Sequence, residues 1–101
     1  MSWYPLAKTT DVEPGRVAVF DAHEHRVALC NVDGMFYAID DVCTHDGGAL
    51  DQGELEGTEI ECPRHGARFD VRTGAVRALP AFAPIATYPV RVEGDRVEVE
   101  L

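Results

Sequence analysis

The chain has 101 residues, 46% of them hydrophobic, and a formal net charge of -9 at pH 7. This size suits one domain with one modest core, and the excess of acids argues against nucleic-acid binding. No apolar run approaches the roughly twenty residues that cross a bilayer, and residues 1–8 lack the basic and apolar parts of a signal peptide, so we expect a soluble cytoplasmic protein. We also expect it to be a monomer.

The first part of the chain predicts an antiparallel meander. Segments 16–21 and 26–32 are expected to be paired strands joined through residues 22–25. A turn at 32–34 then leads into a strand at 35–39. No window of the chain keeps helical periodicity for three turns, so we expect an all-β protein.

The rest of the chain predicts further short strands. A strand at 58–62 comes first, and a turn at 73–74 should fold Phe69 back against Val76. The remaining predicted elements are a loop at 78–84 and two alternating strands, 88–92 and 96–101, that form a hairpin around Glu93-Gly94-Asp95. We expect the two ends of the chain to form the base of the fold and its middle to hold the functional site.

Two short segments combine a cysteine with a histidine, and sixteen residues separate them: Cys43-Thr44-His45 and Cys62-Pro63-Arg64-His65. Glycines follow both segments, at Gly47, Gly48 and Gly66, as is typical of sharp loops. Two thiolates and two imidazoles can hold one tetrahedral zinc or a cluster with unequal ends. A zinc finger usually places its cysteines on one turn and its histidines on one helix, so the mixed order favours the cluster.

The pattern C-x-H, sixteen residues, then C-P-x-H-G resembles the ligand signature of Rieske proteins, which hold a [2Fe-2S] cluster. The resemblance extends over the whole chain. It implies one Rieske domain at 1–101, built as an antiparallel β-sandwich base with an inserted cluster-binding subdomain at about 42–82. It also implies one [2Fe-2S] cluster per chain.

The resemblance assigns a role to each ligand. Cys43 and Cys62 would bind the buried iron, which stays ferric, and His45 and His65 would bind the outer iron, which is reduced and faces the partner. A loop at Pro80 would cover the cluster. The glycines Gly47, Gly48 and Gly66 would let backbone N–H groups approach the sulfurs; they would also allow tight turns, a role that does not exclude the first.

Two departures from the respiratory members of the family bear on the redox potential. Those proteins have a disulfide between the ligand loops, where this chain has Gly48 and Arg64. They also have serine and tyrosine hydroxyls that donate to the cluster sulfurs, where this chain has Ala67 and Phe69. Fewer donors predict a potential in the lower part of the Rieske span of about -150 to +300 mV.

The resemblance to Rieske ferredoxins implies a carrier, not an enzyme, that passes single electrons from an NAD(P)H-dependent flavoprotein reductase to a terminal non-haem iron oxygenase. Eight of the eighteen acids lie between Asp40 and Glu61, a stretch without Lys or Arg. Four of the nine basic residues lie in the next sixteen residues, at Arg64, Arg68, Arg72 and Arg77. The acids would steer transient partners, or would only keep the surface soluble.

Other interpretations stay open at this point. The chain could be a small Rieske subunit of a nitrite-reductase-like system, an accessory protein of iron-sulfur assembly, or a zinc-binding interaction module. A catalytic oxygenase is disfavoured, because it needs a further domain with its own iron site. Cys30 is expected to be a buried small hydrophobe, and His23 and His25 are expected to be surface residues of the first hairpin.

Overall fold

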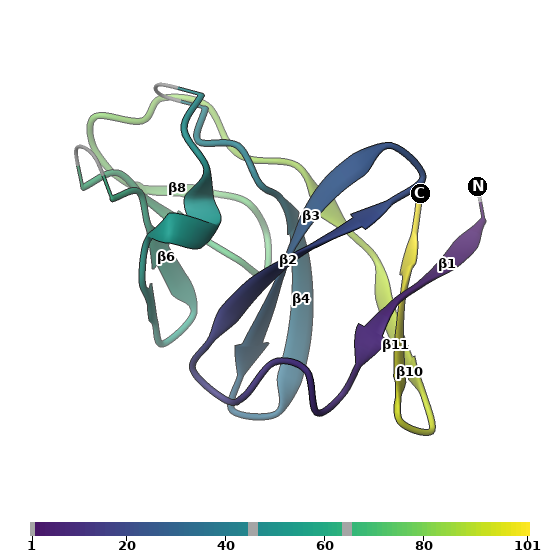
Figure 1. Ribbon diagram of the computed structural model, residues 1–101. Helices are drawn as coiled ribbons and strands as arrows, with labels where there is room; N and C mark the ends of the chain where they lie inside the picture. The colour runs from purple at the N-terminus through teal and green to yellow at the C-terminus, as the bar shows by residue number, and fades with distance from the viewer. Residues whose placement is uncertain (1, 45–46, 64–65) are drawn as a thin grey trace.

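The computed structural model describes residues 2–44, 47–63 and 66–101 (Figure 1). Within these ranges the chain forms three antiparallel sheets and one short 3-10 helix, η1 (Leu50–Gln52). The all-β prediction is confirmed. No helix in the described part of the chain is long and apolar enough to cross a membrane.

Eleven strands make up the sheets in the described ranges. In chain order they are β1 (Trp3–Lys8), β2 (Val17–Ala22), β3 (His25–Val32), β4 (Met35–Asp40), β5 (Leu55–Glu56), β6 (Glu59–Glu61), β7 (Arg68–Asp70), β8 (Val76–Ala78), β9 (Thr87–Tyr88), β10 (Val90–Glu93) and β11 (Arg96–Glu100). Five predicted strands have ends within one residue of β2, β3, β4, β6 and β11. Short turns with strong local signals explain this agreement.

The central layer is the four-stranded sheet β2-β3-β4-β9. Successive side chains of a strand point to opposite faces, so a continuous apolar run can fill two cores at once. In β3, Val27 and Leu29 belong to one buried cluster, and Ala28 and Cys30 belong to another. The apolar run of β3 therefore lies between two cores, one on each face of the sheet.

The base core lies between the central sheet and the sheet β1-β11-β10 (Figure 1). Its buried members are Val12, Val27, Leu29, Ala38, Val97 and Val99. The sequence does not predict β1, in which Pro5 interrupts the alternation and the register shifts between Pro5 and Ala7. Pairing of β1 with β11 brings residues from the two ends of the chain into one sheet, as expected.

The predicted strand at 88–92 is divided at Pro89 between two sheets. Tyr88 of β9 pairs with Ala38, whereas Val90 of β10 pairs with Val99. Proline has no N–H to donate to a ladder, so the chain changes sheet at this residue. The prediction of one continuous strand is wrong, although the hairpin of β10 and β11 is confirmed.

The third sheet, β5-β6-β7-β8, lies on the other side of the central sheet (Figure 1). Phe69 pairs with Val76, as the turn at 73–74 predicts. The site core lies between this sheet and the central one, and its members are Ala28, Cys30, Ile39, Cys43, Leu50, Ile60, Cys62, Ala67, Phe69, Val71, Ala81 and Ile85. The boundary of an inserted subdomain at 42–82 stays a prediction.

Candidate metal centre

Cys43 begins a tight loop that follows the end of β4. Its N–H donates to the carbonyl oxygen of Gly48 at 2.8 Å, and its own carbonyl oxygen accepts from the N–H of Gly47 at 2.7 Å. Gly47 has a φ of 75°, a left-handed conformation that glycine adopts without steric cost. These bonds fix the backbone on both sides of the cysteine.

Cys62 begins a loop of the same build between β6 and β7. Its N–H donates to the carbonyl oxygen of Ala67 at 2.7 Å, and its carbonyl oxygen accepts from Gly66 at 3.1 Å. Gly66, like Gly47, is four residues after its cysteine and has a positive φ, 78°. The glycine spacing in the sequence therefore reflects the same pair of backbone hydrogen bonds at each cysteine.

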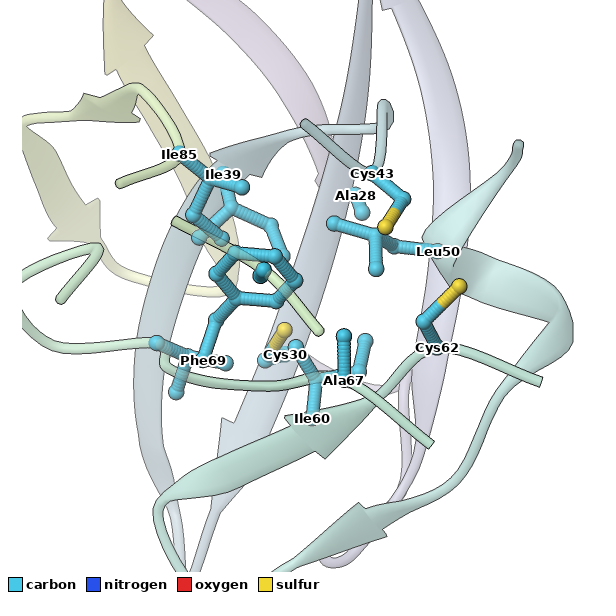
Figure 2. Close-up of a cluster of buried hydrophobic side chains, with 12 residues drawn as sticks. Ala28, Cys30, Ile39, Cys43, Leu50, Ile60, Cys62, Ala67, Phe69 and Ile85 are labelled. Carbon is cyan, nitrogen blue, oxygen red and sulfur yellow. The ribbon is translucent and has the colours of Figure 1, made fainter. Parts of the chain in front are cut away.

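The two cysteine side chains meet in the site core. Cys43 is 0% exposed and Cys62 is 1% exposed. Figure 2 shows them entering the same region from different loops, beside Leu50. Two sulfur donors brought together in a buried apolar setting fit one end of a [2Fe-2S] cluster. The predicted partners His45 and His65 lie outside the described residues, so their assignment rests on the sequence.

The glycine amides have a defined use in these loops. Because Gly47 and Gly66 donate to the cysteine carbonyl oxygens, their amides close the turns. This is the turn-forming role that we expected alongside hydrogen bonding with sulfur. The approach of backbone N–H groups to the sulfurs at Gly47, Gly48 and Gly66 stays a prediction, because a turn-forming role does not exclude it.

Asp41 fixes the start of the first ligand loop, a role that the sequence does not reveal. Its buried carboxylate accepts from the N–H of Asp51 at 2.8 Å and from Nε of Arg26 at 3.3 Å. Burial raises the pKa of Asp41 to about 6, against the opposing effects of the hydrogen bond from the Asp51 N–H and of the Arg26 charge. The carboxylate connects strand β3, helix η1 and the segment that leads to Cys43.

Gly53, also missed from the sequence, lets two segments of the site approach closely. A Cβ at this residue would collide with the backbone oxygen of Glu61, the residue before Cys62. Its φ of -87° is open to any residue, so the requirement is for space and not for a special backbone conformation. Gly53 therefore sets how closely the chain after η1 packs against the second ligand loop.

The loop that contains Pro80 lies beside the first ligand loop. The hydroxyl of Thr44 donates to the carbonyl oxygen of Ala83 at 2.6 Å. Ala81 is buried in the site core together with both cysteines. The structure therefore brings the predicted loop next to the candidate centre, and its role as a cover is a proposal.

Ala67 and Phe69 are both fully buried in the site core. Neither side chain carries a hydrogen-bond donor. Ala67 accepts the N–H of Cys62 through its carbonyl oxygen, so it lies directly at the second ligand loop. The two residues that the resemblance matches to hydroxyl donors are thus apolar and belong to the same core as the cysteines.

Several acids between Asp40 and Glu61 form ion pairs with arginines of the same chain, which the sequence alone does not reveal. Arg68 forms ion pairs with three of them, Glu56 at 3.4 Å, Glu59 at 2.9 Å and Glu61 at 3.4 Å. Asp41 is buried beside Arg26. Among the acids of this stretch that the structure describes, four therefore have basic partners: Asp41, Glu56, Glu59 and Glu61.

The comparison with known proteins identifies the family. A family model described as the Rieske [2Fe-2S] domain matches residues 2–89. The ferredoxin component of biphenyl 2,3-dioxygenase from Rhodococcus jostii (strain RHA1) is 41% identical over 100% of this chain and 94% of its own length. The naphthalene 1,2-dioxygenase ferredoxin component of Pseudomonas aeruginosa is 40% identical over 98% of this chain and 95% of its own. The chain belongs to the Rieske [2Fe-2S] family and carries one [2Fe-2S] cluster.

Solved structures agree with this assignment. The ferredoxin of carbazole 1,9a-dioxygenase from Nocardioides aromaticivorans IC177 has a TM-score of 0.93 and 37% identity, covering 98% of this chain and 97% of its own. A second carbazole dioxygenase ferredoxin, solved in complex with its oxygenase, has a TM-score of 0.90 and 34% identity over 96% of this chain and 91% of its own. A protein described as a nitrite reductase small subunit, 21% identical, shares the fold alone. Because members of this family hold a [2Fe-2S] cluster, the interpretation as a zinc-binding interaction module is excluded.

Proposed function

We propose that this protein is a low-potential Rieske ferredoxin that passes single electrons from an NAD(P)H-dependent flavoprotein reductase to a terminal non-haem iron oxygenase. The observation that carries the proposal is the match over nearly the whole chain to ferredoxin components of aromatic-ring dioxygenase systems. The partners would bind transiently to a monomeric carrier in the cytoplasm.

We assign Cys43 and Cys62 to the inner iron and His45 and His65 to the outer iron. When bound, the cluster takes up and releases one electron at a time. The two cysteines supply thiolate charge from buried positions, and the apolar side chains around them, including Leu50, exclude water. Pro80, from the loop beside Thr44, would complete this enclosure.

The low potential follows from what surrounds the sulfurs. A hydrogen bond to sulfur stabilises the additional negative charge of the reduced state, and its absence lowers the potential. Ala67 and Phe69 provide no such bond from their side chains. A donor fed by a nicotinamide cofactor can reduce a carrier of this kind, whereas oxidation of quinol needs a higher potential.

Reconstitution tests the proposed function. The purified protein is mixed with NADH, biphenyl, and the reductase and oxygenase of the Rhodococcus jostii biphenyl system. We expect hydroxylated product only when the ferredoxin is present, and none with Cys62→Ser, which loses a cluster ligand. The proposal fails if the protein shows an intact cluster spectrum but accepts no electrons from the reductase and donates none to the oxygenase.

A further inference from the structure

The segment 78–86, here called the apolar strip, reads Ala-Leu-Pro-Ala-Phe-Ala-Pro-Ile-Ala, nine consecutive residues without a polar side chain. It occurs in a chain with a net charge of -9. We propose that the exposed face of this strip is the docking surface for the terminal oxygenase. This inference rests on the proposed function and adds the residues that hold the partner.

The strip has a buried side and an exposed side. Ala81 and Ile85 are 1% and 4% exposed and belong to the site core. Leu79 and Phe82 are 72% and 85% exposed. Exposure of a whole phenyl ring gives nothing to the stability of the chain itself, and contiguous apolar surface of this kind marks sites of protein association.

The exposed side chains stand on a fixed backbone. Thr44 donates its hydroxyl to the carbonyl oxygen of Ala83 at 2.6 Å, and the N–H of Ile85 donates to Gly74 at 2.9 Å. The carbonyl oxygen of Ala86 accepts from the N–H of Asp40 at 2.9 Å. The strip is therefore held at its centre and its end, so binding would require little ordering of the backbone.

The location of the strip indicates a redox partner. It is bonded to Thr44, the residue after Cys43, and it shares a core with both cysteines. Val42, next to Cys43, is a third exposed large apolar residue, 41% exposed. A protein that covers these side chains would lie beside the two loops that begin at the ligand cysteines.

The chemistry of the strip and of its surroundings indicates what the partner presents. The centre of a protein interface is poor in charge and rich in aromatic residues, while charges at its rim steer approach. The strip supplies Phe82 as the aromatic anchor. We therefore expect the oxygenase to present an apolar recess that receives this ring, and a carbazole relative does form a complex with its own oxygenase.

The test measures how oxygenase concentration determines the rate at which the reduced ferredoxin is reoxidised in a stopped-flow instrument. The probe is the oxygenase of the Rhodococcus jostii biphenyl system. We expect Phe82→Ser to weaken binding roughly thirtyfold and Leu79→Ser to weaken it roughly tenfold. Phe82→Leu, which keeps an apolar anchor, should recover most of the affinity.

Met35→Ser is the matched control, because Met35 is 62% exposed but begins β4 next to the turn that joins β3 and β4. Its rates should equal those of wild type. Unchanged visible and electron paramagnetic resonance spectra establish that each variant retains its cluster.

Equal rates for wild type and Phe82→Ser would overturn the docking proposal while leaving the proposed function in place. So would a loss confined to electron transfer from the reductase, or sedimentation data showing that Phe82 holds two copies of this chain together. If wild-type ferredoxin itself fails to reduce the oxygenase, the proposed function and the docking proposal fail together.

Discussion

Asp70 is a buried carboxylate at the end of β7, with a side chain that is 1% exposed. Arg72 donates to it from Nη2 at 2.9 Å and from Nε at 3.1 Å, and Arg77 adds a third contact at 3.1 Å. The hydrogen bonds from Arg72 hold the pKa of Asp70 well below its usual range. Both arginines are about half exposed, so loss of the carboxylate would not leave a buried cation.

We predict that Asp70→Asn lowers the free energy of unfolding by about 2–4 kcal/mol at pH 7. Because the folded-state pKa is lowered, this stabilisation is complete above the unfolded-state pKa of about 3.9 and is lost as the pH falls below it. Urea unfolding of both proteins from pH 7 to pH 3 measures the difference. A difference that grows on acidification would contradict the assignment.

Ala67 and Phe69 provide a second prediction at the scale of single residues. Ala67→Ser and Phe69→Tyr each add a hydroxyl in the site core. Where the hydroxyl reaches a sulfur, we expect the potential to rise by roughly 20–65 mV, the equivalent of one hydrogen bond of about 0.5–1.5 kcal/mol. Protein-film voltammetry on the three proteins measures the shift. A lower potential in either variant would show that other groups determine it.

Cys30 illustrates a thiol with a packing role. It is 0% exposed, as predicted for a small buried hydrophobe, and burial raises its pKa to about 12. We predict that iodoacetamide at pH 8 does not label Cys30 in the folded protein but labels it in urea. Mass spectrometry of the peptide with Cys30 gives the answer, and rapid labelling of the folded protein would contradict the buried placement.

At the scale of elements, the contact between η1 and β6 depends on Gly53. Gly53→Ala would place a methyl group against the backbone of Glu61 and push the Cys62 loop away from η1. We expect a loss of about 1–3 kcal/mol in the free energy of unfolding and less iron bound per chain. Glu54→Ala, at the exposed neighbouring residue, is the control and should retain both properties. Equal iron content in Gly53→Ala would contradict a role in positioning the loop.

The elements that the sequence predicts well have local signals. The turn at 73–74 and the hairpin around Gly94 depend on residues adjacent in the chain, and both are confirmed. Proline at residue 89 is itself a local signal against one continuous strand, and the prediction passed over it. The pairing of β1 with β11, and the choice of partners for β9 and β10, depend on which distant strands are available. A single sequence without the packed sheets does not contain that second kind of information.

In the candidate site too, features with a local sequence signal are predicted and features that depend on distant contacts are not. The Cys-His spacing predicts the metal centre because ligand chemistry restricts the residue types. Asp41 and Gly53 have no such signature, since their roles come from contacts with η1 and with Glu61. The exposure of Phe82 likewise depends on which face of the strip the core covers.

At the scale of the whole molecule, charge is expected to control the rate of encounter with partners. Several acids of the stretch from Asp40 to Glu61 form ion pairs with Arg26 or Arg68. Among the described acids of this stretch, those outside these ion pairs are Asp40, Asp51 and Glu54. If these acids steer partners, raising ionic strength to about 0.15 M should slow electron transfer from the reductase, because the Debye length falls to about 8 Å.

Glu54→Gln should reduce this salt dependence, and Asp95→Asn, in the turn of the β10–β11 hairpin, should leave it unchanged. Neither substitution should alter the redox potential. Stopped-flow rates at several salt concentrations test the prediction. Rates that do not respond to salt would leave only a role in solubility for the acids.

We propose that Cys43, His45, Cys62 and His65 hold the cluster with which this chain carries electrons. The most direct measurement is the iron and acid-labile sulfide content of purified wild-type protein, His65→Ala and His23→Ala. In the wild type, His23 lies in the first hairpin and its imidazole stacks on Tyr4 of β1. We predict about two irons and two sulfides per chain for wild type and for His23→Ala. His65→Ala should lose both iron and sulfide. Equal cluster content in the two variants, or stoichiometric zinc without sulfide in wild type, would contradict the account.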